Sequence, residues 1–194
     1  MLISNVLIIF TMLLHPNGLS GAPDQNTMMK WVHGTLIVLL ILNAFGFGVV
    51  ISFIKAKRRD TNLCLLFYYV GLGSIILAAL ISGFVQTSLE QSFSDDREAL
   101  LIFNKFSWIV NQSLSKLGLV SYGAAGLLLV PITAWAERGL RLVGLVSGLV
   151  GSILVVSILI GAQLSVSNMT MLSIFIVLWH AAIGVYLIKG QKTV

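Results

Sequence analysis

The sequence predicts an all-α protein, a polytopic transmembrane helix bundle that forms a single domain over residues 1–194. Apolar residues make up 57% of the chain and charged residues only 10%, against roughly 45–50% and about 25% in soluble domains. The apolar residues are gathered in long runs, and a run of about 20 is enough to cross a bilayer as a helix. Nearly all charged residues fall between these runs.

Six apolar runs are predicted to span the membrane. Five of them are long and contain no charged residue: 31–54, 63–85, 117–136, 142–164 and 170–188. The first run, 2–14, is short, because its residues would reach only about 20 Å of a hydrocarbon core that is ~30 Å thick. No basic residue precedes Lys30, so the run lacks the positive flank of a signal peptide. We expect a retained first span; a cleaved signal would leave five spans, and a misplaced start or a truncation is the third alternative.

The distribution of lysine and arginine predicts the orientation of the spans. Eight basic residues fall on one side of the predicted topology: Lys55, Lys57, Arg58, Arg59, Arg138, Arg141, Lys189 and Lys192. The opposite loops, 15–30, 86–100 and 164–169, contain five acidic residues and only two basic ones. Because basic loops stay in the cytoplasm, both termini are predicted to be cytoplasmic.

Residues 97–116 are predicted to form a helical segment with a polar stripe. No proline or glycine occurs between Asp96 and Gly118, so one long helix is expected that either projects from the bilayer or breaks near Lys116. At helical spacing the polar residues fall on two neighbouring faces: Asn104, Asn111, Ser115 and Gly118 on one, and Lys105, Gln112 and Lys116 on the other. We expect this stripe to face a solvated groove between helices, because charged side chains in lipid are costly.

Polar residues inside a membrane are candidate functional residues for the same reason. His180 lies ten residues into the last span and next to Trp179. It is interpreted as a proton relay, a ligand contact or a metal ligand, or else as a neutral histidine bonded to a neighbouring helix. Asn43 is interpreted mainly as an interhelical contact. The candidate ligand-binding residues are His180, Asn104, Asn111, Gln112, Lys116 and His33.

The sequence carries no catalytic motif, and no Asp or Glu falls inside an apolar run. We therefore expect no enzymatic activity, and no cofactor or metal is assigned. An alternative is a haem- or copper-binding redox protein. For haem, His33 and His180 differ by about 10 Å in predicted depth, which is poor axial geometry. For copper, Met28, Met29, Met169 and Met171 gather at the predicted outer face near His15 and His33, and thioether and imidazole suit Cu(I).

The expected function is to bind or pass a small or lipophilic ligand, or to serve as an accessory subunit of a membrane complex. The expected partners are the lipid bilayer, such a ligand, and a membrane protein or a second copy of the chain. The net charge of +5 is explained by basic residues at span ends, so nucleic acid is not expected. Gly144, Gly148 and Ser152 recur every four residues, a spacing that predicts close helix packing within the bundle.

Several short motifs occur in a recognisable order. They are His15-Pro16-Asn17-Gly18, His33, Ile81-Ser82-Gly83-Phe84, Phe103-Asn104 with Asn111-Gln112, and the region of Trp179. Together they resemble a group of small, uncharacterised bacterial multi-pass inner-membrane proteins with the same span order. The likeness covers most of the chain and implies a bacterial inner-membrane location and a shared topology, but it implies no activity. The short first span departs from the pattern of that group.

Overall fold

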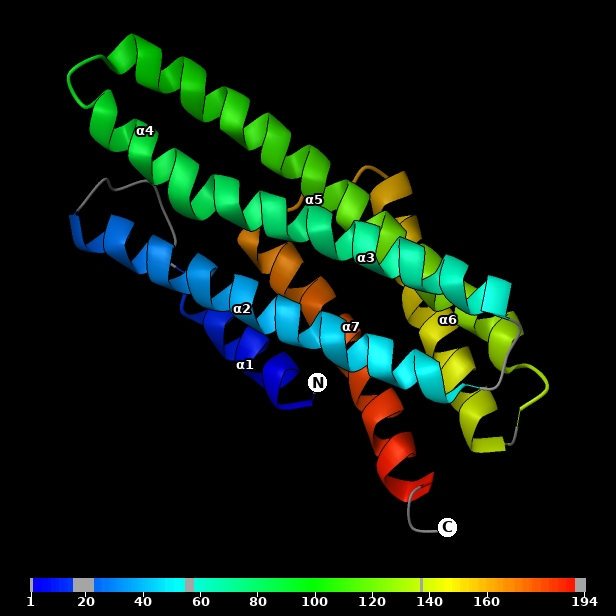
Figure 1. Ribbon diagram of the computed structural model, residues 1–194. Helices are drawn as coiled ribbons and strands as arrows, with labels where there is room; N and C mark the ends of the chain where they lie inside the picture. Colours follow the sequence, from blue (N-terminus) through cyan, green and yellow to red (C-terminus); the bar gives the residue numbers. More distant parts are fainter. Residues whose placement is uncertain (1, 16–22, 55–57, 137, 191–194) are drawn as a thin grey trace.

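The computed structural model describes residues 2–15, 23–54, 58–136 and 138–190 (Figure 1). In this part of the chain every regular element is helical, which confirms the predicted all-α bundle. The elements are α1 (Leu2–Leu13), α2 (Pro23–Phe53), α3 (Arg58–Leu80), the π-helical turn η1 (Ile81–Val85), α4 (Gln86–Ser92), α5 (Arg97–Thr133), α6 (Arg138–Leu159) and α7 (Val166–Gly190).

Within the described residues, five helices are long and apolar enough to cross a membrane, so the chain is an integral membrane protein. They are Gln25–Ser52, Arg59–Ser92, Arg97–Thr133, Arg138–Leu159 and Asn168–Tyr186. The shorter α1 has 12 residues, which correspond to about 18 Å. Asn5 of α1 is bonded to Asn43 of α2, and His15 contacts His33. The short helix therefore runs antiparallel to α2 and covers only its middle.

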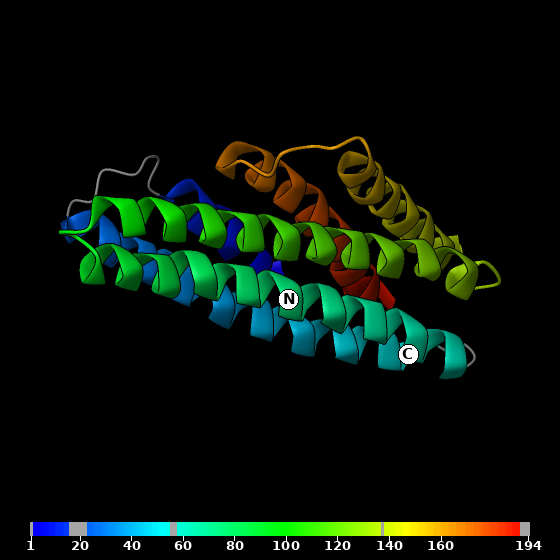
Figure 2. The same ribbon diagram turned by 90° about the horizontal axis from the view of Figure 1, so that it is seen from above.

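α3, η1 and α4 follow one another without a break and form a long hairpin with α5. α5 has 37 residues, or about 55 Å, far more than the ~30 Å hydrocarbon core. It passes through Lys116 as one continuous helix, so the long helix expected from the sequence does not break there. Asp96 caps its start by accepting a hydrogen bond from the Ala99 amide (3.0 Å), which satisfies one of the open N–H groups of the first turn. The hairpin end extends beyond α1, α6 and α7 (Figures 1 and 2).

Glycines bring α5 and α6 into close contact. A Cβ atom on Gly126 would lie 2.6 Å from the Ser147 carbonyl oxygen, and one on Gly151 would lie 2.5 Å from the Gly123 carbonyl oxygen. Gly144 and Gly148 also face α5, against Thr133 and Val130. The predicted use of these small residues for packing inside the bundle is thus confirmed, although Ser152 of the same row is exposed.

Replacing Gly126 with alanine is expected to lower the thermal midpoint of unfolding in detergent, by a packing cost of about 1–3 kcal/mol. The reason is that the new methyl group would meet backbone, which cannot rotate away. Gly73→Ala is the matched control, because no atom lies within 4 Å of a Cβ built there. Both changes bring the same gain in helix propensity, so equal midpoints for the two variants would contradict the close α5–α6 contact.

Candidate functional site

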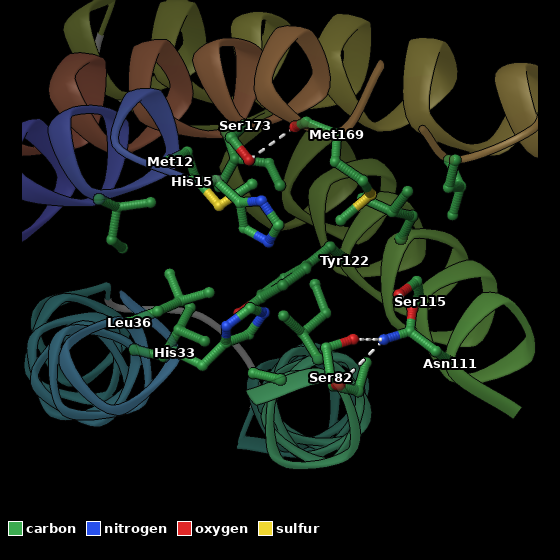
Figure 3. A pocket seen from close by; sticks show the side chains of 18 of the residues that line it. Met12, His15, His33, Leu36, Ser82, Asn111, Ser115, Tyr122, Met169 and Ser173 are labelled. Atoms are coloured by element: carbon green, nitrogen blue, oxygen red, sulfur yellow. Dashed lines mark hydrogen bonds between the residues drawn. The ribbon is translucent and has the colours of Figure 1, made fainter. Parts of the chain in front are cut away.

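A cavity of about 380 Å³ lies between α1, α2, the α3–η1–α4 segment, α5 and α7 (Figure 3). Its volume is within the range of roughly 300–1,000 Å³ that is usual for small-molecule sites. Most of its wall is apolar and includes Ile8, Leu36, Leu40, Ile75, Leu119 and Ile176. None of the described residues that line it is Lys, Arg, Asp or Glu.

The cavity runs along the bundle and reaches its middle. Along α2 the lining extends from Met29 to Asn43, a distance of about 21 Å on a helix. We call the end of the cavity near His15, Gln86 and Leu164 its mouth; Leu164 lies in the connection between α6 and α7. Its deep end lies at Asn43 and His180, past the midpoints of α2 and α7.

The deep end is closed by a buried hydrogen-bonded cluster, here called the deep network, formed by Ser4, Asn5, Asn43, Tyr68 and His180. Each of these residues is at most 5% exposed. The Ser4 hydroxyl donates to Asn43 Oδ1 (2.9 Å), and Asn43 Nδ2 donates to Asn5 Oδ1 (3.0 Å). The imidazole of His180 contacts Asn5 Oδ1 through Nδ1 (3.1 Å) and the Tyr68 hydroxyl through Nε2 (3.3 Å). The network therefore ties together α1, α2, α3 and α7.

The hydrogen bonds of His180 define which ring nitrogen carries the proton. Asn5 Oδ1 can only accept, so Nδ1 of His180 must donate to it. Nε2 then lies against the Tyr68 hydroxyl (3.3 Å) and can accept from it in a neutral tautomer. Both ring nitrogens are thus used within the bundle. Of the two interpretations of His180 made from the sequence, this arrangement is the one with a neutral histidine bonded to neighbouring helices.

The mouth of the cavity contains two other histidines. Nδ1 of His33 donates to the Met29 carbonyl oxygen one turn earlier (2.9 Å), which fixes the ring and leaves Nε2 directed away from that bond. The rings of His15 and His33 have centroids 5.1 Å apart and meet edge to face. Gly83 lets η1 pack closely against His33 of α2, since a Cβ atom on Gly83 would lie 2.4 Å from His33 Cβ. Single π-helical turns of this kind are frequent at functional sites.

The polar stripe of α5 supports the cavity wall. Asn111 donates from Nδ2 to the Ala78 carbonyl oxygen (3.0 Å) and to the Ser82 hydroxyl. Gln112 pairs with the backbone of Leu164, donating to its carbonyl oxygen (2.9 Å) and accepting from its amide (3.1 Å). These two side-chain amides therefore join α5 to α3, to η1 and to the α6–α7 connection.

The structure brings four of the six predicted site residues together around this cavity: His33, Asn111, Gln112 and His180. Asn104 and Lys116 are half-buried on α5 but are not among the lining residues. Sequence reasoning did not single out Asn5 or Tyr68. The signal for Asn5 was present, because an amide in a short apolar run is costly in lipid and needs a partner.

Among the described residues, no three His, Cys, Asp or Glu side chains are placed to hold a metal ion together. Comparison with known proteins gives no relative. No protein-family model matches the sequence, and no curated protein or solved structure matches it.

Proposed function

We propose that this membrane protein binds or passes a small, neutral, largely apolar molecule in the cavity, without chemical conversion. The observation that carries the proposal is a ligand-sized cavity of about 380 Å³ whose wall is mainly apolar and whose described lining residues carry no formal charge. A charged ligand would lose its hydration without gaining an ionic partner there. A neutral apolar ligand would bury its surface at no such cost.

The polar groups of the wall favour a ligand with few hydrogen-bonding groups. Asn111 and Gln112 already bond the backbone of other segments, and His180 uses both ring nitrogens. His33 lies at the mouth, and its bond to the Met29 carbonyl oxygen uses only Nδ1. We infer that the ligand places its apolar body inside the cavity and any polar atom at the mouth.

The proposed location is the bacterial inner membrane, with the mouth of the cavity directed outward. Arg59, Arg138 and Arg141 lie at the starts of α3 and α6, at the end of the bundle opposite to the mouth. By the positive-inside rule this basic end is proposed to lie in the cytoplasm, and the choice of the bacterial inner membrane follows from the resemblance proposed for the sequence motifs. An accessory role in a larger membrane complex is compatible with the same cavity if the ligand is passed to a partner protein.

Two further observations bear on the alternatives. No carboxylate occurs beside the histidines among the described lining residues, whereas a carboxylate orients the histidine of a Ser–His–Asp triad, and we propose a non-enzymatic role. Haem ligation by His33 and His180 is disfavoured, because His180 would have to give up a hydrogen bond within the deep network before it could coordinate iron.

Photolabelling in membranes with a small neutral alkyl diazirine tests the proposal. In the native protein we expect labels at cavity-lining positions such as Ile176, mapped by mass spectrometry of peptides. Ala79→Phe should remove these labels, because Ala79 lines the cavity and phenylalanine would fill it. Leu77→Phe is the matched control, since Leu77 lies on the same helix but is 51% exposed on the outer surface. The proposal would be contradicted if the lining positions of the native protein were not labelled, or if they were still labelled in Ala79→Phe.

A further inference from the structure

The mouth of the cavity gathers soft donor groups that come from three helices and a connecting segment. The imidazoles of His15 and His33 and the side chains of Met12, Met29 and Met169 all line it. Figure 3 shows the two imidazoles turned toward each other across the cavity, with Met12 and Met169 reaching into the same space. Of the methionines grouped by the sequence, Met28 (40% exposed) and Met171 (55% exposed) instead lie outside the cavity, and Met12 of α1 takes their place.

His33 has the arrangement that metal-binding histidines usually have. Such histidines donate one ring N–H to a carboxylate or a backbone carbonyl, which fixes the tautomer and orients the other nitrogen toward the metal. In this protein Nδ1 of His33 donates to the Met29 carbonyl oxygen (2.9 Å), so the lone pair lies on Nε2. His180 differs, because both of its nitrogens are bonded within the deep network.

The separation of His15 and His33 suits a shared ion. A metal–nitrogen bond of about 2.0–2.1 Å places the ring centroid about 3 Å from the ion, so two rings on one ion have centroids within roughly 6 Å of each other. The centroids of these two rings are 5.1 Å apart. The separation of the two rings is therefore compatible with a shared ion.

The chemistry of the donors selects the kind of ion. Thioether sulfur and imidazole nitrogen favour Cu(I), whereas Mg²⁺ and Ca²⁺ require oxygen ligands. The described lining residues carry no formal charge, so a singly charged ion is desolvated there at lower cost than a doubly charged one. We propose that the mouth of the cavity is a Cu(I) site, in which His15 and His33 supply nitrogen and Met12 and Met169 supply sulfur. This site goes beyond the proposed ligand function and does not depend on it.

Competition for Cu(I) tests the site. The full chain, purified in detergent and kept reduced, would be titrated with Cu(I) held by the chromophoric chelator bicinchoninate. We expect one Cu(I) per chain. The double variant Met12→Leu/Met169→Leu should bind at least about tenfold more weakly, since even outer-shell changes cost about 10–100-fold in metal affinity. Leucine keeps the side-chain volume close to that of methionine, so the fold is preserved.

The control is the double variant Met28→Leu/Met171→Leu, in which two methionines outside the cavity are changed. It should bind Cu(I) like the native protein, and His33→Ala should lose the site. Equal losses in the two methionine variants, no loss in either, or Zn(II) competing as tightly as Cu(I) would each overturn the proposal. Photolabelling of the deeper cavity is measured without copper, so failure of the metal site and failure of the ligand proposal are separate results.

Discussion

Replacing Asn43 with leucine is expected to lower the free energy of unfolding by about 1–3 kcal/mol, the usual cost of leaving buried polar groups without a bond. Asn43 accepts from the Ser4 hydroxyl and donates to Asn5 Oδ1, and all three residues are buried. Leucine can do neither, so α1 would lose both of these bonds to α2. The measurement is the midpoint of thermal unfolding in mixed micelles, with Asn62→Leu as the matched control because Asn62 is exposed.

A double-mutant cycle shows whether this loss belongs to the network. Asn5→Leu combined with Asn43→Leu removes both partners of the 3.0 Å bond. The double variant should therefore lose less stability than the sum of the losses in the two single variants. Interhelical hydrogen bonds in membrane proteins have coupling energies that average about 0.6 kcal/mol and reach about 1.7 kcal/mol. Strict additivity, or an Asn43→Leu effect no larger than that of Asn62→Leu, would show that α1 is held by apolar packing alone.

The helices themselves could be predicted from the sequence because the bilayer limits the possibilities. A run of about 20 uncharged apolar residues has one stable form in lipid, a helix that bonds its own backbone. The spans of α2, α6 and α7 follow directly from this rule. The sequence did not decide whether α5 is one long helix, because only the polar Lys116 indicated a break. A helix without glycine or proline continues when tertiary contacts support it.

The candidate site could be predicted only in part. Asn111, Gln112 and His180 were found because a polar side chain at membrane depth needs a partner. The partners themselves were not predictable, since Asn5 and His180 are separated by 175 positions along the chain and sequence spacing says nothing about which helices are neighbours. For the same reason the sequence could not show that Met12 lies at the cavity mouth and that Met28 does not. Lys116 and Asn104 share the faces of Gln112 and Asn111. Asn104 nevertheless lies before the part of α5 that borders the cavity, which extends from Trp108 to Tyr122, and Lys116 lies within that part without lining the cavity.

Reaction of two adjacent introduced cysteines tests most directly whether an accessible cavity reaches the middle of the membrane. Val177 lines the cavity, whereas the next residue, Leu178, is 54% exposed on the outer surface that faces lipid. Both lie within the span Asn168–Tyr186, about 14 Å along the helix from its start. The native Cys64 is buried, with its thiol directed at the Ala125 carbonyl oxygen (3.4 Å), so the unmodified chain gives the background.

The measurement is the rate at which a small, positively charged methanethiosulfonate reagent, added to intact membranes, modifies each cysteine. Val177→Cys should react at least about a hundredfold faster than Leu178→Cys, because bringing a charged group to the bilayer centre costs about 2.5–3.5 kcal/mol on the insertion scale. A cavity open to water removes that cost for Val177→Cys alone. Similar rates at the two positions, or a faster reaction of Leu178→Cys, would contradict a solvent-accessible cavity inside the bundle.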